Sequence, residues 1–305
     1  MLRRILLAVI FLVAVSGFAA QTDEIETAYK ALQTADAGKD FDGVLKAADS
    51  CFQLSNALIR APQPADQDKV EAWKNAAVYA KQVRAYAEYT VNIAIVRTAD
   101  PAKRIQAFEA LDKGAPDSGY LPNLYGLMLG TYAGMKPDRS FQFAQSVVAK
   151  APKDQDVLLV LANGYYERKQ YDSAASFGTR LAAVMGSHGR PEGMPTGDWE
   201  FKRTAMVGRG HWIAGMSYAA QQKYPQAVES LKASLPFLKS EPKLLAGAQF
   251  QIGVAAYNLA RPVRDKAMMQ EALKFSELAA ATDSPYRAPA QQNVYAIKQE
   301  LLRLR

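Results

Sequence analysis

The chain has 305 residues, of which 49% are hydrophobic and 22% are charged, and its formal net charge at pH 7 is +7. This length supports a large core in one elongated domain or two compact domains. The single cysteine, Cys51, excludes an intramolecular disulfide, and its neighbours Ala47, Ala48 and Phe52 predict a buried side chain in a helix. The basic residues are scattered without a block of five or more, which favours a solvated surface over a nucleic-acid-binding face.

The first twenty residues, MLRRILLAVIFLVAVSGFAA (1–20), have the features of a secretory signal peptide. Two arginines precede an unbroken apolar run over 5–15, and Gly17 and Ala19 supply the small residues of a cleavage site. We therefore expect cleavage near Ala19 or Ala20 and an exported protein, periplasmic or secreted, with an uncleaved N-terminal anchor as the alternative. No later segment approaches the ~20 apolar residues that a membrane-spanning helix needs.

Beyond residue 20, apolar residues recur at spacings of three and four along nearly the whole chain, which is the period of an amphipathic helix. No alternating strand pattern of useful length interrupts this period, so we predict an all-α fold. One segment, 67–98, is long enough to contain a break. The predicted helices, in chain order, cover 23–36, 41–60, 67–98, 101–114, 120–134, 138–150, 155–169, 171–186, 198–222, 224–238, 242–260, 264–282 and 286–304.

Two segments repeat each other at an offset of 36 residues. DPAKRIQAFEALDKGAPDS at 100–118 aligns without gaps to KPDRSFQFAQSVVAKAPKD at 136–154. In each copy a proline, Pro101 or Pro137, stands in the first turn of a helix, where its missing N–H costs no hydrogen bond, and a second proline ends the helix.

Small and aromatic residues recur at matching offsets in a second pair of segments, 161–174 and 215–227, which are 53 residues apart. A small residue where two helices cross lets their backbones approach closely. One helix pair cannot bury its apolar face alone, so the recurrence predicts stacked pairs with a continuous core. The matched positions are Ala162 and Gly215, Tyr165 and Tyr218, Tyr171 and Tyr224, and Ala174 and Ala227.

This pattern resembles the tetratricopeptide repeat (TPR), a 34-residue pair of antiparallel helices. The resemblance is best over 155–188 and 208–241. It implies a right-handed α-α superhelix, a TPR-like solenoid of antiparallel helix pairs, that forms one domain over 21–305. The apolar stripe of 286–304 suits a capping helix at its C-terminal end. The Gly- and Pro-rich segment 187–198 leaves open a subdivision at that point.

In that family the first helix of each pair lines a concave groove that holds peptides, so the resemblance implies such a groove here. Trp, Tyr and Met suit an adaptable binding surface. The sequence departs from the family's carboxylate clamp, because Leu159 stands where a lysine is expected and Ile213 where an asparagine is expected. We expect Tyr166 and Trp212 to be the anchors. The groove-facing positions of the two best repeats are Asp156, Leu159, Asn163, Tyr166, Arg209, Trp212 and Met216.

Residues for catalysis or metal binding are few. The chain has two histidines, His188 and His211, and contains none of the motifs HExxH, CxxC, GxSxG and GxxxxGK[ST]. We therefore predict that the protein is not an enzyme and has neither a cofactor nor a metal site. Asp198 is predicted to cap the start of a helix. The segment 187–198 is either a flexible insertion or an ordered binding loop.

These observations predict a non-enzymatic scaffold of the bacterial cell envelope that binds a partner protein or peptide in its groove and does not bind nucleic acid. The alternative is a module for cell-wall glycan or anionic lipid, driven by the positive charge, with membrane association at the surface alone. A third hypothesis is an enzyme whose site includes His188 and the loop 187–198. The sequence indicates neither the partner's identity nor the oligomeric state.

Overall fold

The computed structural model describes the backbone of residues 2–304 and the side chains of residues 20–136 and 138–304. Within these residues the chain forms thirteen α-helices, one short 3₁₀ helix and no β-strand, which confirms the predicted all-α class. The helices gather into two compact units, Met1–Met135 and Lys136–Arg305. The segment 187–198, where the sequence left open a subdivision, lies inside the second unit.

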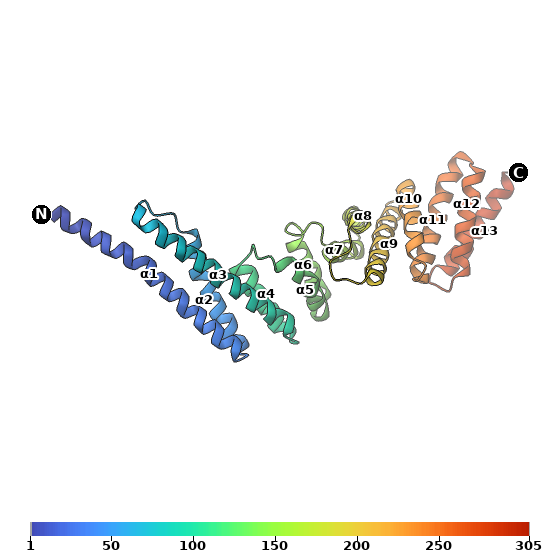
Figure 1. Cartoon of the computed structure of the whole chain (residues 1–305). Coiled ribbons are helices and arrows are strands. Elements are labelled where there is room, and N and C mark those ends of the chain that lie inside the picture. The colour runs from blue at the N-terminus through green and yellow to red at the C-terminus, as the bar shows by residue number, and fades with distance from the viewer. Residues whose placement is uncertain (1, 305) are drawn as a thin grey trace. The chain divides into compact units, whose positions relative to one another are not determined.

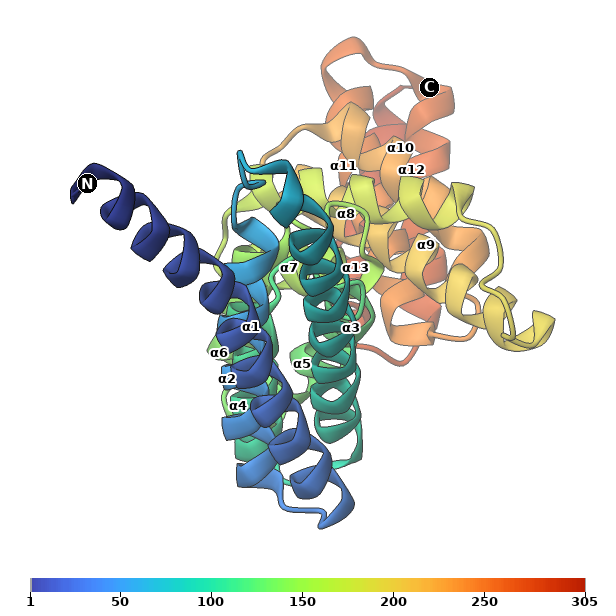
Figure 2. The same ribbon diagram turned by 60° about the vertical axis from the view of Figure 1, so that its left-hand side comes forward.

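The first unit consists of five helices: α1 (Leu2–Ala37), α2 (Phe41–Arg60), α3 (Gln67–Arg97), α4 (Pro101–Gly114) and α5 (Leu121–Met135). Helices α1, α2 and α3 lie side by side, α4 packs on α2 and α3, and α5 packs on α4 (Figures 1 and 2). The core of the unit lies between these helices and includes Phe52, Ile95 and Leu111, whose side chains are almost completely buried. Helix α3 runs unbroken over the segment in which a break was considered.

The second unit continues with eight α-helices and the 3₁₀ helix η1 (Leu235–Phe237). Each helix packs on the next along the chain, and α7, α9, α11 and α13 also pack in a row, each on the following odd-numbered helix. In the described part of this unit no contact of similar extent joins α8 to α10 or α10 to α12. Each even-numbered helix from α8 onward therefore packs against two members of that row. The eight α-helices are α6 (Pro137–Val147), α7 (Gln155–Glu167), α8 (Tyr171–Ser187), α9 (Thr196–Ala220), α10 (Tyr224–Ser234), α11 (Pro242–Val263), α12 (Lys266–Ala281) and α13 (Arg287–Arg303).

Four of the helix pairs are joined by the same backbone turn, although its left-handed residue is not glycine in any of them. In each turn one residue has left-handed φ, between 53° and 59°, and the next residue donates its N–H to the carbonyl five residues earlier. These bonds are characteristic of a helix that ends in a Schellman turn. The turns join α1 to α2, α7 to α8, α9 to α10 and α11 to α12, and the left-handed residues are Lys39, Lys169, Gln222 and Arg264.

The repeat at an offset of 36 residues is also visible in the backbone hydrogen bonds. After α4, Ala115 N–H donates to the Leu111 carbonyl over 2.8 Å, and after α6, Ala151 N–H donates to the Val147 carbonyl over 2.9 Å. Both helices begin at a proline, as predicted. The sequence repeat at 100–118 and 136–154 therefore corresponds to a repeated local structure.

Glycines permit close contact where α8 crosses α9. A Cβ atom added to Gly178 would lie 2.7 Å from the Gly210 carbonyl oxygen, and one added to Gly210 would lie 2.6 Å from the Gly178 carbonyl oxygen. Real Cβ atoms do not approach backbone atoms so closely, so only glycine fits both positions without a shift of one helix. Dense packing of this kind depends on small residues at the crossing point.

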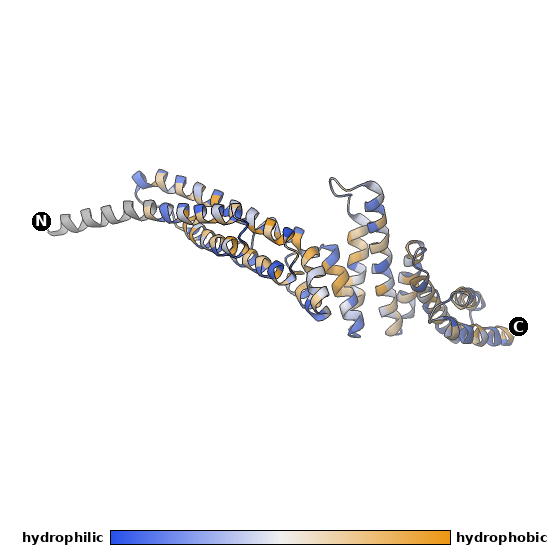
Figure 3. Ribbon diagram, turned by 90° about the horizontal axis from the view of Figure 1, so that it is seen from below, coloured by the Kyte–Doolittle hydropathy of each residue, from blue (hydrophilic) through white to orange (hydrophobic). Residues whose placement is uncertain are grey.

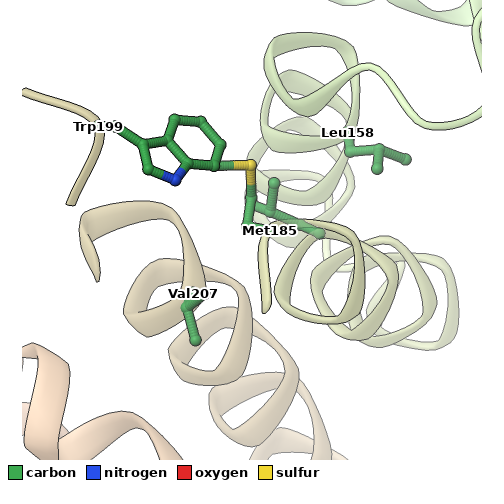
Figure 4. Close-up of a cluster of buried hydrophobic side chains, with 5 residues drawn as sticks. Leu158, Met185, Trp199 and Val207 are labelled. Atoms are coloured by element: carbon green, nitrogen blue, oxygen red, sulfur yellow. The ribbon is translucent and has the colours of Figure 1, made fainter. Parts of the chain in front are cut away.

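Helix α9 begins two residues earlier than predicted, and its fourth residue, Trp199, is buried. Asp198, predicted to cap this helix, lies within its first turn instead, because α9 begins at Thr196. Its carboxylate still stands at the positive end of the helix. The next residue, Trp199, is 4% exposed, and Figure 4 shows its indole next to Met185 of α8, in a cluster that also contains Leu158.

The prediction for Cys51 is confirmed, because its side chain is fully buried in α2. Burial raises the pKa of the Cys51 thiol to about 11, so the thiol is protonated and unreactive at neutral pH.

The signal-peptide prediction falls on residues 1–20, and the side chains of 1–19 lie outside the described residues, so it stays a prediction. Among the described residues, every helix falls short of the combined length and hydrophobicity that crossing a membrane requires. Figure 3 shows hydrophilic and hydrophobic residues alternating along these helices.

Candidate binding face on helices α7, α9 and α11

Four predicted groove residues lie on one stripe of α7. Asp156, Leu159, Asn163 and Tyr166 follow one another at spacings of three and four residues, which places them on one side of the helix. All four side chains are half-buried. The residues of α7 between them, such as Leu158 and Leu161, are buried in the core.

The three predicted groove positions on α9 differ in how far their side chains are buried. Arg209 and Trp212 are half-buried, as a groove position requires. Met216, however, is only 6% exposed and packs in a core cluster with Leu231 and Ile252. We therefore correct its assignment from a groove residue to a core residue. The amphipathic period does not distinguish the two, because Met216 lies at the edge of the apolar stripe and the packing of α10 and α11 decides whether it is covered.

Aromatic side chains connect the three helices of this face. The rings of Tyr166 on α7 and Trp212 on α9 are 6.2 Å apart, and the Trp212 indole N–H donates to the Leu244 carbonyl of α11 over 3.1 Å. A second ring, that of Tyr171, lies 5.8 Å from Tyr166. Desolvation by these neighbours raises the pKa of Tyr166. Both anchors are therefore held rigidly, which reduces the entropy that a ligand contact would cost.

Two ion pairs join the same helices. Asp156 on α7 lies 3.9 Å from the ammonium of Lys202 on α9, and Arg209 on α9 lies 3.3 Å from the carboxylate of Glu241 before α11. All four side chains are about one-third exposed, so each pair contributes at most about 1 kcal/mol. They place two acidic and two basic side chains on the helices that carry the aromatic residues.

Asn163 is the polar group of this face that remains available. Its side chain is half-buried between Leu159 and Tyr166 on the stripe, and it makes no hydrogen bond with any described residue. A primary amide offers two donors and an acceptor, which matches the N–H and C=O groups of a peptide backbone. Since a half-buried amide without a protein partner is solvated, a bound peptide can replace that water.

Sequence reasoning missed Lys202, Glu241, Leu244 and Tyr286. The ring of Tyr286, just before α13, lies 5.6 Å from Phe250 and would contact a Cβ atom at Gly247, so it covers part of α11. Burial is the main cause of the raised pKa of Tyr166, and Tyr286 adds to it. The helical period gave no signal for Tyr286, because this residue lies in the connection before α13.

Neither histidine belongs to this face. His211 is half-buried, and burial lowers its pKa, so it is neutral at pH 7. His188 is exposed at the end of α8, where it lines a shallow cleft of about 380 Å³. Met194 anchors the neighbouring loop by packing against the Trp199 cluster. Within the described residues, no group of three or more His, Cys, Asp and Glu side chains could hold a metal ion.

Two clefts of more than 500 Å³ lie in the first unit. The larger, of about 1020 Å³, runs between α1 and α2 and is lined by small residues such as Ala31, Gly43 and Ala47. The other, of about 510 Å³, lies between the α1–α2 turn and α3. Sequence reasoning identified neither. The first lies between two consecutive helices, whose packing distance the period of each helix does not specify, and the walls of the second come from segments about fifty residues apart.

Comparisons with known proteins do not identify a family. No family model matches the chain, and no curated protein matches it. One similar solved structure comes from work described as "Computational Design of Self-Assembling Cyclic Protein Homooligomers". It is 12% identical, the alignment covers 94% of this chain and 97% of that chain, and the TM-score is 0.24, which is too low to carry an argument.

Proposed function

We propose that this protein is a non-enzymatic helical-repeat scaffold that binds a partner protein or peptide on the face formed by α7, α9 and α11. The proposal includes a TPR-like, right-handed stack of helix pairs that ends in α13. The row of odd-numbered helices, the four equal turns and the glycine crossing of α8 and α9 all support a stack of pairs. Placement in the bacterial cell envelope rests on the signal-like features of residues 1–20.

The observation that carries the proposal is the unpartnered amide of Asn163 beside the rigid pair Tyr166 and Trp212. An extended peptide that crosses α7 and α9 would receive backbone hydrogen bonds from Asn163 and apolar contact from the two rings. Aromatic residues held in place by their neighbours are the usual centres of binding energy at protein interfaces. The ion pairs at Asp156 and Arg209 would then favour partners that carry both charges.

The test compares partner capture from a cell-envelope extract by the wild type and by Asn163→Ala. Asn163 has no protein partner, so the variant should keep its melting temperature and lose about tenfold in affinity for a partner. A matched control is Asn258→Ala, since Asn258 is exposed and bonds only to the Val254 carbonyl of its own helix. If Asn163→Ala and the double variant Tyr166→Ala with Trp212→Ala retained every partner, this face would not be the binding site.

A second candidate function is favoured by the distribution of charge. The sequence of the second unit has 23 Lys and Arg against 15 Asp and Glu, whereas that of the first unit has 14 against 15. The net positive charge of the chain therefore resides in the second unit, which suits an anionic glycan or lipid headgroup. Sedimentation with purified cell wall or anionic vesicles should then weaken steeply as salt rises, and no binding at low salt would remove this candidate.

A further inference from the structure

The cleft of about 510 Å³ in the first unit has an ordered set of chemical groups along its length. Thr90, Ile93, Ala94 and Arg97 lie on one stripe of α3, at spacings of three, one and three residues. Seven residues of helix span about 10 Å, so Thr90 and Arg97 stand at opposite ends of this stripe. The remaining lining residues come from the end of α1, the α1–α2 turn, the start of α2 and the residue after α3: Asp36, Lys39, Phe41, Val44 and Thr98.

A buried hydroxyl stands at one end of the cleft. Thr90 is 3% exposed, and its hydroxyl has no hydrogen-bond partner. The Tyr86 hydroxyl, one turn earlier on α3, donates to the Asp36 carboxylate over 3.4 Å. Burial raises the pKa of Tyr86, and the Thr90 hydroxyl, which is near it but not at hydrogen-bond distance, acts weakly in the opposite direction. Leaving a buried hydroxyl unbonded costs stability, and a hydrogen-bonding group of a ligand would remove that cost.

Two cations without partners also line the cleft. The side chains of Lys39 and Arg97 are exposed and make no ion pair or hydrogen bond with any described residue. A third cation, Lys103, lies 5.0 Å from the centre of the Phe41 ring, which is part of the lining. Asp36 is the one acidic residue in the lining, so the charges there favour an anion.

We propose that this cleft binds a small carboxylate about 10 Å long, with an apolar middle and a hydrogen-bonding group at its far end. The carboxylate would lie between Lys39 and Arg97, where a guanidinium can hold it with two hydrogen bonds. The apolar part would contact Val44, Ile93 and Ala94, and the distal group would bond to the Thr90 hydroxyl. The cleft volume is within the range of small-molecule sites. This site is separate from the peptide-binding face, so it does not depend on the proposed function.

Two sources share this chemistry, the carboxyl terminus of a short peptide and a free alkyl acid. Calorimetric titration of the full chain would use three probes: N-acetyl-alanyl-valine, the same dipeptide with a C-terminal amide, and 8-hydroxyoctanoate. Binding of the dipeptide acid alone indicates a peptide terminus, and binding of the hydroxy acid alone indicates a free acid. The amide should bind at least about tenfold more weakly than the acid, because it lacks the charge. Equal binding of acid and amide, or no heat with any probe up to millimolar concentration, overturns the proposal.

Variants distinguish the two ends of the cleft. Arg97→Gln with Lys39→Gln should weaken carboxylate binding at least about tenfold, whereas Lys81→Gln, which removes an exposed cation elsewhere on α3, should leave it unchanged. Thr90→Val should weaken binding about five- to tenfold without lowering the melting temperature, because the hydroxyl it removes has no partner. Unchanged affinity in the Arg97 and Lys39 variant, or a lower melting temperature with unchanged affinity for Thr90→Val, would contradict the assignment.

Discussion

Replacing Gly210 by alanine should destabilise the second unit, although alanine is the better helix former. Inside an ordinary helix this exchange stabilises by about 1 kcal/mol. At Gly210 the added Cβ would lie 2.6 Å from the Gly178 carbonyl oxygen and 2.8 Å from the Ala182 backbone nitrogen. Neither backbone atom can rotate aside, so we place the overpacking cost at about 2–3 kcal/mol and the net loss of unfolding free energy at about 1–2 kcal/mol.

Urea unfolding followed by tryptophan fluorescence would measure this loss, because Trp199 is buried in the cluster that packs α8 on α9. The matched control is Gly186→Ala on α8, where an added Cβ meets no atom within 4 Å. The control should stabilise the protein by up to about 1 kcal/mol. Opposite signs for the two variants are therefore expected. If Gly210→Ala were as stable as the wild type or more stable, α8 and α9 would not approach as closely as described.

Three further changes test other parts of the fold. Between pH 9 and pH 11 the Cys51 thiol ionises in the unfolded chain but stays protonated in the folded protein, whose thiol pKa is about 11. The free energy of unfolding should therefore fall by up to about 1.4 kcal/mol per pH unit over this range. Denaturant unfolding at pH 9 and at pH 11 should show a smaller fall for Cys51→Ala than for the wild type. Lys169→Gly should raise the unfolding free energy by about 0.5–1 kcal/mol by relieving left-handed φ, whereas Lys274→Gly inside α12 should lower it by a similar amount. Arg104→Lys should lower the free energy of unfolding by about 2 kcal/mol. The guanidinium donates to two backbone carbonyls at the C-terminal end of α3 and to a hydroxyl on α5, and an ammonium cannot make all three bonds. Thermal unfolding would measure the loss, and an unchanged melting temperature would contradict this reasoning.

Much of the helical organisation could be predicted because its causes are local. The 3.6-residue period, the prolines at the start of α4 and α6 and the small residues at 162 and 215 act over one or two turns of helix. The turns after α7 and α9 gave no such signal, because Lys169 and Gln222 adopt a conformation that usually indicates glycine.

The candidate sites were predicted less completely. The stripe on α7 was implied by the resemblance to the tetratricopeptide repeat, and its residues Asn163 and Tyr166 are half-buried. The same resemblance assigned Met216 to the groove, but contacts with α10 and α11 bury it. The cleft beside Thr90 could not be predicted, because its two walls come from segments about fifty residues apart in the chain.

By itself, the sequence determined the approximate extent of most helices, which side of each is apolar, and that Cys51 is buried. Those properties depend on the period of a single helix and on the side chains within one or two turns. Only the tertiary structure decided which apolar residues are covered, which polar groups keep no partner, and where clefts remain. These depend on the distance and angle between packed helices, and a repeating pattern along one helix does not specify its neighbour.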